Sequence, residues 1–205
     1  MESLSMIQWC PKRGDTMKKK IQNVILHPVT MTVIGLFTGF FVKILDIYCY
    51  AQYFGTSLSD IFSQAGVWIV IGIVISLYSR TTKLAMINMF LFCAGMLLTY
   101  YITADVTNSV YGWTFIKAWA VFACFSPVMA WLARLTRNPG PVALLLKIGV
   151  FAGYIGLNWV LGSFLHYYDF PFLAALIYLL FVKKWQPIKS EQITTEKIEQ
   201  TKKET

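Results

Sequence analysis

Ionisable residues that interrupt long apolar stretches are the positions of this sequence best suited to chemistry. Lys43 and Asp46 lie three residues apart, which places both side chains on one face of a helix, where they can form an ion pair. A charged group in apolar surroundings costs roughly a few kcal/mol, so such residues are usually paired or functional. The pair can either lock one helix into a bundle or line a polar cavity.

Further polar residues are expected at a similar depth in, or at the outer ends of, the neighbouring apolar stretches. They are Lys117, Asn158, Trp159, Asp105, His166 and Asp169. Together with Lys43 and Asp46 they predict an outward-facing pocket with both signs of charge, which would suit a small zwitterionic or aromatic ligand. The simpler alternative is that the loop residues are solvated and that the Lys117 amine extends to the membrane surface.

The sequence lacks the patterns of common catalytic and metal sites. It has no glycine-rich phosphate loop, no His-Glu-x-x-His and no Ser, His and Asp at a common depth. Its four cysteines and two histidines show no spacing typical of a ligand set, and no cysteine pair is expected to meet on the outer side. We therefore expect no enzyme activity, no cofactor, no metal site and no disulfide.

The composition indicates that this chain folds in a membrane. Of its 205 residues, 57% are hydrophobic and 14% are charged, and the mean hydropathy is +0.57. Soluble domains average roughly 45–50% apolar and about 25% charged residues. A chain this short could not hide such an excess of apolar surface from water. The net charge of +8 is expected on cytoplasmic loops, so nucleic acid is not the expected partner.

The hydropathy pattern predicts an all-α fold, a polytopic bundle of six transmembrane helices. A spanning helix needs about 20 mostly apolar residues. The six segments, the last of them short, cover Pro28–Ala51, Asp60–Tyr78, Leu84–Thr103, Tyr111–Ala133, Val142–Phe164 and Phe170–Trp185. They divide the chain into a cytoplasmic segment at 1–27, a transmembrane domain at 28–185 and a polar tail at 186–205. The tail has no helical apolar period and is expected to be disordered.

The distribution of charge predicts the orientation. Outside the predicted spans, every Lys and Arg falls in the N-terminal segment, in the second-to-third or fourth-to-fifth loop, or at the C-terminal end. The three remaining loops carry Asp60, Asp105 and Asp169 instead. The positive-inside rule then places both termini in the cytoplasm, which requires an even number of spans.

The N-terminal segment contains a second methionine at which translation could begin. Arg13-Gly14-Asp15 can be encoded by a purine-rich ribosome-binding sequence a few nucleotides before Met17. Residues 1–16 would then be absent from the natively expressed protein.

Glycines spaced four residues apart predict close helix packing. The first span contains Gly35-x-x-x-Gly39, and the fifth contains Gly149-x-x-x-Gly153 followed by Gly156. Such faces allow two helix backbones to approach closely in a membrane, and they could dock a partner subunit.

Several short motifs resemble a known family. They are Trp68-x-x-x-Gly72 continuing to Leu77-Tyr78-Ser79-Arg80, the run Gly95-Met96-Leu97-Leu98-Thr99-Tyr100-Tyr101-Ile102-Thr103, and Trp131-Leu132-Ala133-Arg134. They resemble a family of small polytopic bacterial membrane proteins of unknown function over roughly residues 30–185. The resemblance implies a multi-pass protein of the bacterial cytoplasmic membrane and carries no activity. In size and span count the chain is also similar to the substrate-binding subunits of energy-coupling-factor vitamin transporters. Those subunits have Ala-x-x-x-Ala faces where this chain has Gly35 and Gly39.

Two functions from different classes follow from these features. The first is a small-molecule transporter or substrate-binding membrane subunit that uses the outer polar residues. The second is an accessory or scaffold protein that docks a membrane partner through its glycine faces. An open cavity around Lys43 and Asp46 would favour the first, whereas a sealed, paired arrangement would favour the second.

Overall fold

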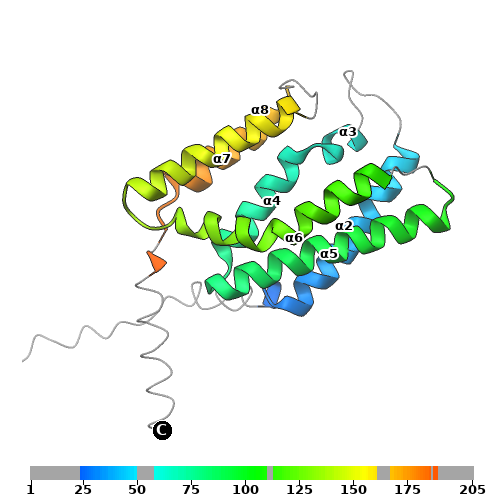
Figure 1. The fold of residues 1–205 in the computed structure, drawn as a ribbon, viewed down its shortest axis with the longest axis horizontal. Helices are drawn as coiled ribbons and strands as arrows, with labels where there is room; N and C mark the ends of the chain where they lie inside the picture. The colour runs from blue at the N-terminus through cyan, green and yellow to red at the C-terminus, as the bar shows by residue number, and fades with distance from the viewer. Residues whose placement is uncertain (1–23, 50–57, 110–112, 161–166, 186, 189–205) are drawn as a thin grey trace, which may run out of the picture.

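The computed structural model describes residues 24–49, 58–109, 113–160, 167–185 and 187–188, and all regular structure in these ranges is helical (Figure 1). The helices are α2 (Pro28–Tyr48), α3 (Leu58–Ser63), α4 (Ala65–Tyr78), α5 (Thr82–Val106), α6 (Trp113–Leu135), α7 (Pro141–Val160) and α8 (Asp169–Ile177). A π-helical turn, η1 (Tyr178–Val182), extends α8. The predicted N-terminal segment and C-terminal tail lie largely outside the described residues.

Four described helices are long and apolar enough to cross a membrane. They cover Pro28–Tyr48, Thr82–Val106, Ile116–Leu135 and Pro141–Trp159. Two shorter apolar helices, Gly66–Tyr78 and Asp169–Val182, coincide with the remaining two segments of the hydropathy pattern. The described part of the chain is therefore all-helical, with several helices suited to a bilayer.

The second predicted span differs from the structure because the helix breaks at Gln64. This residue is extended, with φ −85° and ψ 146°, and it separates α3 from α4. The Trp68 indole N–H donates to the carbonyl of Phe62 at 2.9 Å, which satisfies one of the backbone groups that the break leaves without a helical partner. The Gln64 side-chain amide donates to the hydroxyl of Tyr168, the residue that precedes α8.

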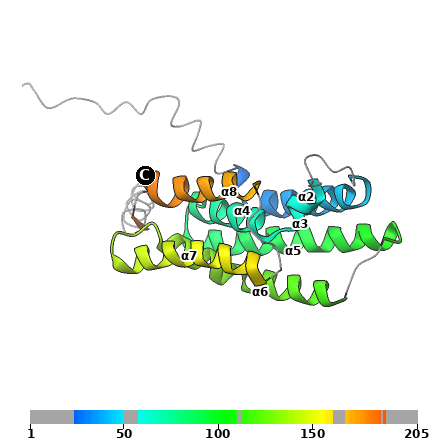
Figure 2. The same ribbon diagram turned by 90° about the horizontal axis from the view of Figure 1, so that it is seen from above.

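Helices α4 and α5 lie in the middle of the bundle (Figure 2). Helix α2 packs mainly on α5, and the two run in the same direction: Asn88 donates to the carbonyl of Leu26, and Thr99 donates to that of Leu36, both at 2.7 Å. The contact is close because Gly35 and Gly39 bring the two backbones together. A Cβ atom on either glycine would lie closer than 3.0 Å to a carbonyl oxygen of α5.

Helix α4 also joins α7 and α8 through an apolar cluster. Its buried members are Ile73, Leu77, Ala133, Tyr154, Leu176, Leu179 and Leu180. Burial of α4 on so many sides explains why its apolar residues show almost no helical amphipathicity. This cluster matters for the site because it lies between a cavity and one charged end of the bundle.

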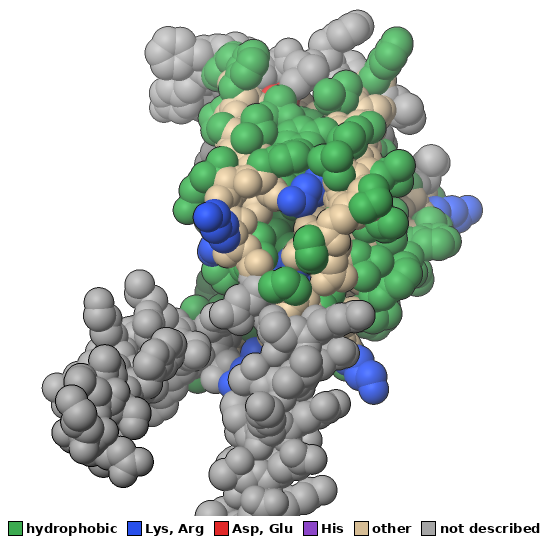
Figure 3. All heavy atoms as spheres, turned by 90° about the vertical axis from the view of Figure 1, so that its left-hand side faces the viewer, with side chains coloured by type: hydrophobic (Ala, Val, Ile, Leu, Met, Phe, Trp, Pro, Cys, Tyr) green, Lys and Arg blue, Asp and Glu red, His purple; other side chains and the backbone are tan. Residues whose placement is uncertain are grey.

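Charges are separated along the bundle. We call one end the acidic end, because all described carboxylates lie at or near it: Asp46, Asp60, Asp105 and Asp169. We call the other the basic end; its described cations, apart from Lys147 two turns into α7, are Arg80, Lys83, Arg134, Arg137, Lys183 and Lys184. Figure 3 looks onto the basic end, where blue Lys and Arg side chains stand among hydrophobic ones.

Candidate functional site

The Lys43–Asp46 pair lies at the junction of α2, α3 and α5. Lys43 Nζ is 2.8 Å from Asp46 Oδ2, and Lys43 is only 1% exposed. The Tyr100 hydroxyl donates to Asp46 Oδ2 and the Ser59 hydroxyl to Asp46 Oδ1, both at 3.1 Å. The Lys43 ammonium also lies 4.9 Å from the centre of the Tyr100 ring. The lysine is thus enclosed and neutralised, while the Asp46 side chain remains 41% exposed.

Asn158 and Asp169 belong to a second polar group, between α7, α8 and the start of α4. The Tyr154 hydroxyl donates to Asp169 Oδ1 at 2.6 Å, and both residues are buried. Asn158 is 3% exposed, and neither atom of its amide has a hydrogen-bond partner within the described part of the chain. The Tyr154 ring also fills the space that a Cβ on Gly66 would need, which fixes α7 against α4.

The remaining predicted site residues do not join either group. Lys117 and Asp105 are exposed, Trp159 is 77% exposed, and His166 lies outside the described residues. The structure therefore places the predicted residues in two separate polar groups and on the surface, without showing one pocket that contains them all. Neither polar group lines the cavity that lies between α4, α6 and α7.

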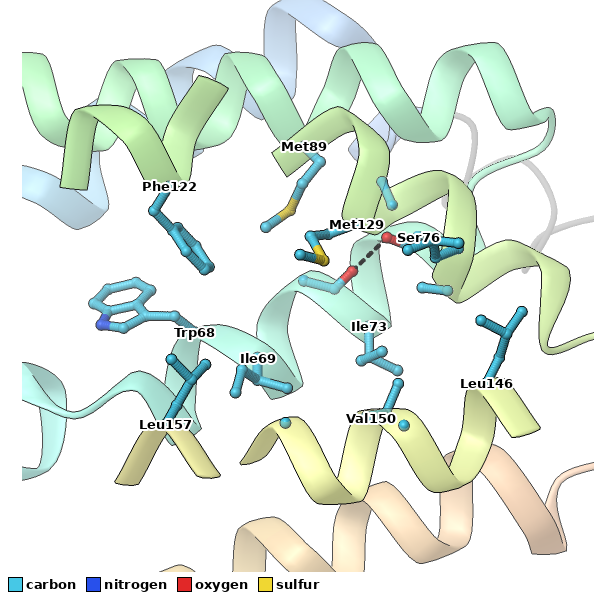
Figure 4. Close-up of a pocket in the computed structure, with 16 residues that line it drawn as sticks. Trp68, Ile69, Ile73, Ser76, Met89, Phe122, Met129, Leu146, Val150 and Leu157 are labelled. Carbon is cyan, nitrogen blue, oxygen red and sulfur yellow. Dashed lines mark hydrogen bonds between the residues drawn. The ribbon is translucent and has the colours of Figure 1, made fainter. Parts of the chain in front are cut away.

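A cavity of about 360 Å³ lies between α4, α6 and α7 (Figure 4). Figure 4 shows Trp68, Ile69 and Ile73 of α4, Phe122 and Met129 of α6, and Leu146, Val150 and Leu157 of α7 around one open space, with Met89 of α5 on its far side. Ser76 is its one polar lining side chain, and its hydroxyl is already bonded to the carbonyl of Gly72 at 2.6 Å. These walls suit a hydrocarbon group and offer almost no polar contacts.

The glycines of α7 contribute to this cavity and show no tight helix contact. Gly149 and Gly153 line it, and a Cβ on either would meet nothing within 4 Å. Gly156 has equally open surroundings but does not line the cavity. This differs from the close packing expected from the sequence, because in the described residues no other helix reaches these three positions.

The basic end contains an aromatic and cationic group that was not predicted from the sequence. Lys183 Nζ lies 4.0 Å from the ring centre of Tyr78 and 4.4 Å from that of Trp185. The guanidinium of Arg137, a residue that is 8% exposed, lies 5.4 Å from the same Trp185 ring. We call Tyr78, Arg137, Lys183 and Trp185 the basic-end cluster. Aromatic residues near the ends of predicted spans, next to basic residues, were the available signal.

Arg134 has a different role at this end. It is buried and donates to the carbonyls of Ser79 and Arg80, the latter at 3.2 Å. These carbonyls lie just beyond the last turn of α4, where a positive charge also interacts favourably with the helix dipole. Arg134 therefore holds the end of α4 in place.

The cavity and the basic-end cluster are joined through shared packing. Ile73 and Ala133 line the cavity and belong to the apolar cluster against which Val150, Tyr78 and Trp185 pack. The arrangement therefore combines the apolar cavity with the positively charged basic-end cluster.

Comparison with known proteins places the chain in one family and gives no activity. A family model described as a family of unknown function (DUF6518) matches residues 18–190. No curated protein and no solved structure matches. A function must therefore be argued from the geometry of the site.

Proposed function

We propose that this chain, which belongs to the DUF6518 family of unknown function, is a six-span protein of the bacterial cytoplasmic membrane that binds a lipid-like molecule. The apolar part of this ligand occupies the cavity between α4, α6 and α7. The role is that of a transporter or substrate-binding membrane subunit, and it is not enzymatic.

Two features support six crossings with both termini in the cytoplasm. The four long apolar helices and the two shorter ones run alternately between the basic and acidic ends. The basic end carries the loops and helix ends rich in Lys and Arg, and cytoplasmic loops are enriched in these residues. The basic end then faces the cytoplasm, where both termini also lie.

The cavity is the observation that carries the binding proposal. Its volume of about 360 Å³ lies within the range of small-molecule sites, and its walls are almost entirely apolar. In an empty cavity of this size the lining side chains would lack many van der Waals contacts. A bound ligand would supply these contacts and stabilise the bundle. In a bilayer the surrounding molecules with matching chemistry are lipids and other long-chain amphiphiles.

The test is to identify what copurifies with protein extracted under mild conditions. Native mass spectrometry of the wild type is expected to show a bound lipophilic molecule. Gly153→Leu fills the cavity from an open position and is expected to lose this molecule. Gly156→Leu is the matched control, because it adds the same side chain to the same helix outside the cavity. Equal occupancy in all three proteins would overturn the proposal.

The bonding of the buried Lys43 to Asp46 favours an accessory or scaffold role as a second candidate. The pair is buried at the lysine and bonded to α3 and α5, as expected for a contact that holds the bundle together. A scaffold would copurify with a membrane protein in fixed stoichiometry and would hold no small molecule. The same mass spectra distinguish the two roles.

A further inference from the structure

We propose that the ligand is an unbranched, single-chain amphiphile, and that one extended hydrocarbon chain of about 12 carbon atoms fills the cavity parallel to its helices. This assignment rests on the proposed function, because it takes the cavity between α4, α6 and α7 to be the binding site. It adds the shape class of the ligand and the residues that limit the length of its chain.

The lining residues show that the cavity is long in the direction of the helices. On α7 the first and last of them are Leu146 and Leu157, which at about 1.5 Å of rise per residue lie roughly 16 Å apart along the axis. On α6 the first and last, Phe122 and Ala133, are separated by the same number of residues. Figure 4 places Phe122 and Leu157 at one end of the open space and Leu146 at the other.

The length and the volume of the cavity together fit one extended chain. A carbon–carbon single bond of about 1.5 Å advances an extended chain by roughly 1.3 Å, so about 12 carbon atoms cover this length. The volume of about 360 Å³ is only between two and three times that of a cavity of roughly 150 Å³ that holds one benzene molecule. Spread over about three helical turns, this volume favours one chain over two chains side by side or a fused-ring molecule.

The walls suit the chain and leave the polar part of the ligand outside. The Ser76 hydroxyl is already bonded to the carbonyl of Gly72, and a polar group without a hydrogen-bond partner is costly to bury. Met89 and Met129 provide flexible, polarizable side chains that can adapt to the bends of an alkyl chain. The headgroup of the ligand therefore lies beyond the apolar walls.

The accessible side of the cavity belongs to α6 and α7. Among the lining residues, Met129 of α6 is 54% exposed and Leu157 of α7 is 39% exposed, whereas Trp68 and Ile73 of α4 are buried. In a membrane an exposed apolar side chain contacts lipid, so a hydrocarbon chain can reach the cavity from the bilayer on this side. This access favours a membrane amphiphile over a water-soluble ligand.

Residues at the two ends set the length of chain that fits. At one end the Trp68 indole is fixed by its hydrogen bond to the carbonyl of Phe62, and Phe122 lies beside it (Figure 4). At the other end Gly149 lies three residues, or roughly 4.5 Å, from Leu146. A Cβ on Gly149 would meet nothing within 4 Å, so a larger side chain there can shorten the space without a clash.

The experiment measures which chain length the delipidated protein selects. An equimolar mixture of lysophosphatidylcholines with chains of eight to eighteen carbons is offered, and the bound species are counted by native mass spectrometry. Occupancy by the wild type is expected to peak at about 12 carbons. It is expected to be at least roughly fivefold lower for the shortest and longest chains, because their methylenes either leave the cavity unfilled or do not fit inside it.

Variants at the two ends are expected to move this peak in opposite directions. Gly149→Leu is expected to move it to chains about three carbons shorter, because it fills the end next to Leu146. Phe122→Ala is expected to move it to longer chains, because it opens the other end. Gly156→Leu and Phe125→Ala are the matched controls on the same helices, since neither residue lines the cavity, and both are expected to leave the peak unchanged.

The outcomes separate this assignment from the proposed function. Equal occupancy by all chain lengths, the same shift in the controls, or equally tight binding of the fused-ring amphiphile deoxycholate overturns the single-chain assignment. If Gly153→Leu still loses the copurified molecule in that case, the cavity remains the binding site. If Gly153→Leu changes nothing, the proposed function fails. Thermal unfolding identifies any variant that does not fold, and Gly149→Ala then replaces Gly149→Leu, with a smaller shift in the same direction.

Discussion

At the scale of single residues, Lys43 shows how a buried charge is accommodated. Its ammonium is held by Asp46, lies against the Tyr100 ring and is almost completely enclosed. The carboxylate of Asp46 receives hydroxyl groups from two other helices. The lysine depends on this one carboxylate, whereas the half-exposed aspartate has further donors and access to solvent or headgroups.

This asymmetry predicts unequal effects of removing either partner. Asp46→Leu is expected to destabilise the protein by about 3 kcal/mol, because it leaves a buried ammonium without its counter-charge. Lys43→Met is expected to cost less. The double variant Lys43→Met/Asp46→Leu is expected to be more stable than Asp46→Leu alone. Thermal unfolding in detergent measures all three, and an additive double variant would contradict this account.

The contact between Tyr154 and Asp169 gives a second prediction at this scale. Tyr154→Phe removes a 2.6 Å hydrogen bond to a buried carboxylate and is expected to cost about 1–3 kcal/mol. Tyr167→Phe is the control, because it makes the same chemical change at an exposed neighbouring position. Equal unfolding temperatures for the two variants would show that the Tyr154 bond contributes little.

Sequence reasoning could identify pairs within one helix but not contacts between helices. The spacing of three residues indicated that Lys43 and Asp46 could pair, because helical geometry alone sets that relation. Ser59 and Tyr100 bond to the pair from other helices, so the spacing of residues within one helix could not predict these contacts. The same holds for Arg134, whose role at the end of α4 depends on where α6 ends relative to it.

At the scale of helices, one glycine pattern has two different environments. Gly35 and Gly39 face the backbone of α5, whereas Gly149 and Gly153 face open space in the cavity wall. The glycine pattern predicts only that one helix face lacks side chains. Whether another helix fills the space beside that face depends on how the neighbouring helices are arranged. The break at Gln64 was also not predicted from the sequence, because the residue itself is neither glycine nor proline and the nearby Gly66 lies within α4.

The two environments predict opposite responses to one added methyl group. Gly39→Ala is expected to destabilise the protein by about 1–3 kcal/mol, because its Cβ would overlap the carbonyl of Met96. Gly156→Ala is expected to be neutral or stabilising by up to about 1 kcal/mol, because alanine favours helix and the space is open. Thermal unfolding compares them, and a similar loss at both sites would contradict the assigned packing.

At the scale of the whole molecule, the separation of charge carries the proposed orientation. Its pattern was readable from the sequence, because loops between apolar segments fall alternately on the two sides of a membrane. The cavity was not readable, because it depends on how α4, α6 and α7 are spaced in three dimensions.

The orientation is tested by labelling single cysteines in a cysteine-free background. Asn108→Cys at the acidic end is expected to react with a membrane-impermeant maleimide in intact cells. Asn138→Cys, in the turn between α6 and α7, is expected to react only after permeabilisation. A green fluorescent protein fused after Thr205 is expected to fluoresce, because the proposed orientation places the C-terminus in the cytoplasm. Labelling of Asn138→Cys in intact cells would show that the basic end faces outward and would contradict the proposed orientation.

The parallel packing of α2 on α5 has a consequence for biosynthesis. Helix α2 leaves the ribosome first, but the helix against which its glycine face fits begins only at Thr82. During translation, Gly35 and Gly39 are therefore inserted before α5 has been synthesised, and in a membrane their face contacts lipid until α5 follows. In a membrane, the packing of α2 on α5 can form only after α5 has entered the bilayer, so in a nascent chain that ends before Thr82 the glycine face of α2 still lacks the helix on which it packs.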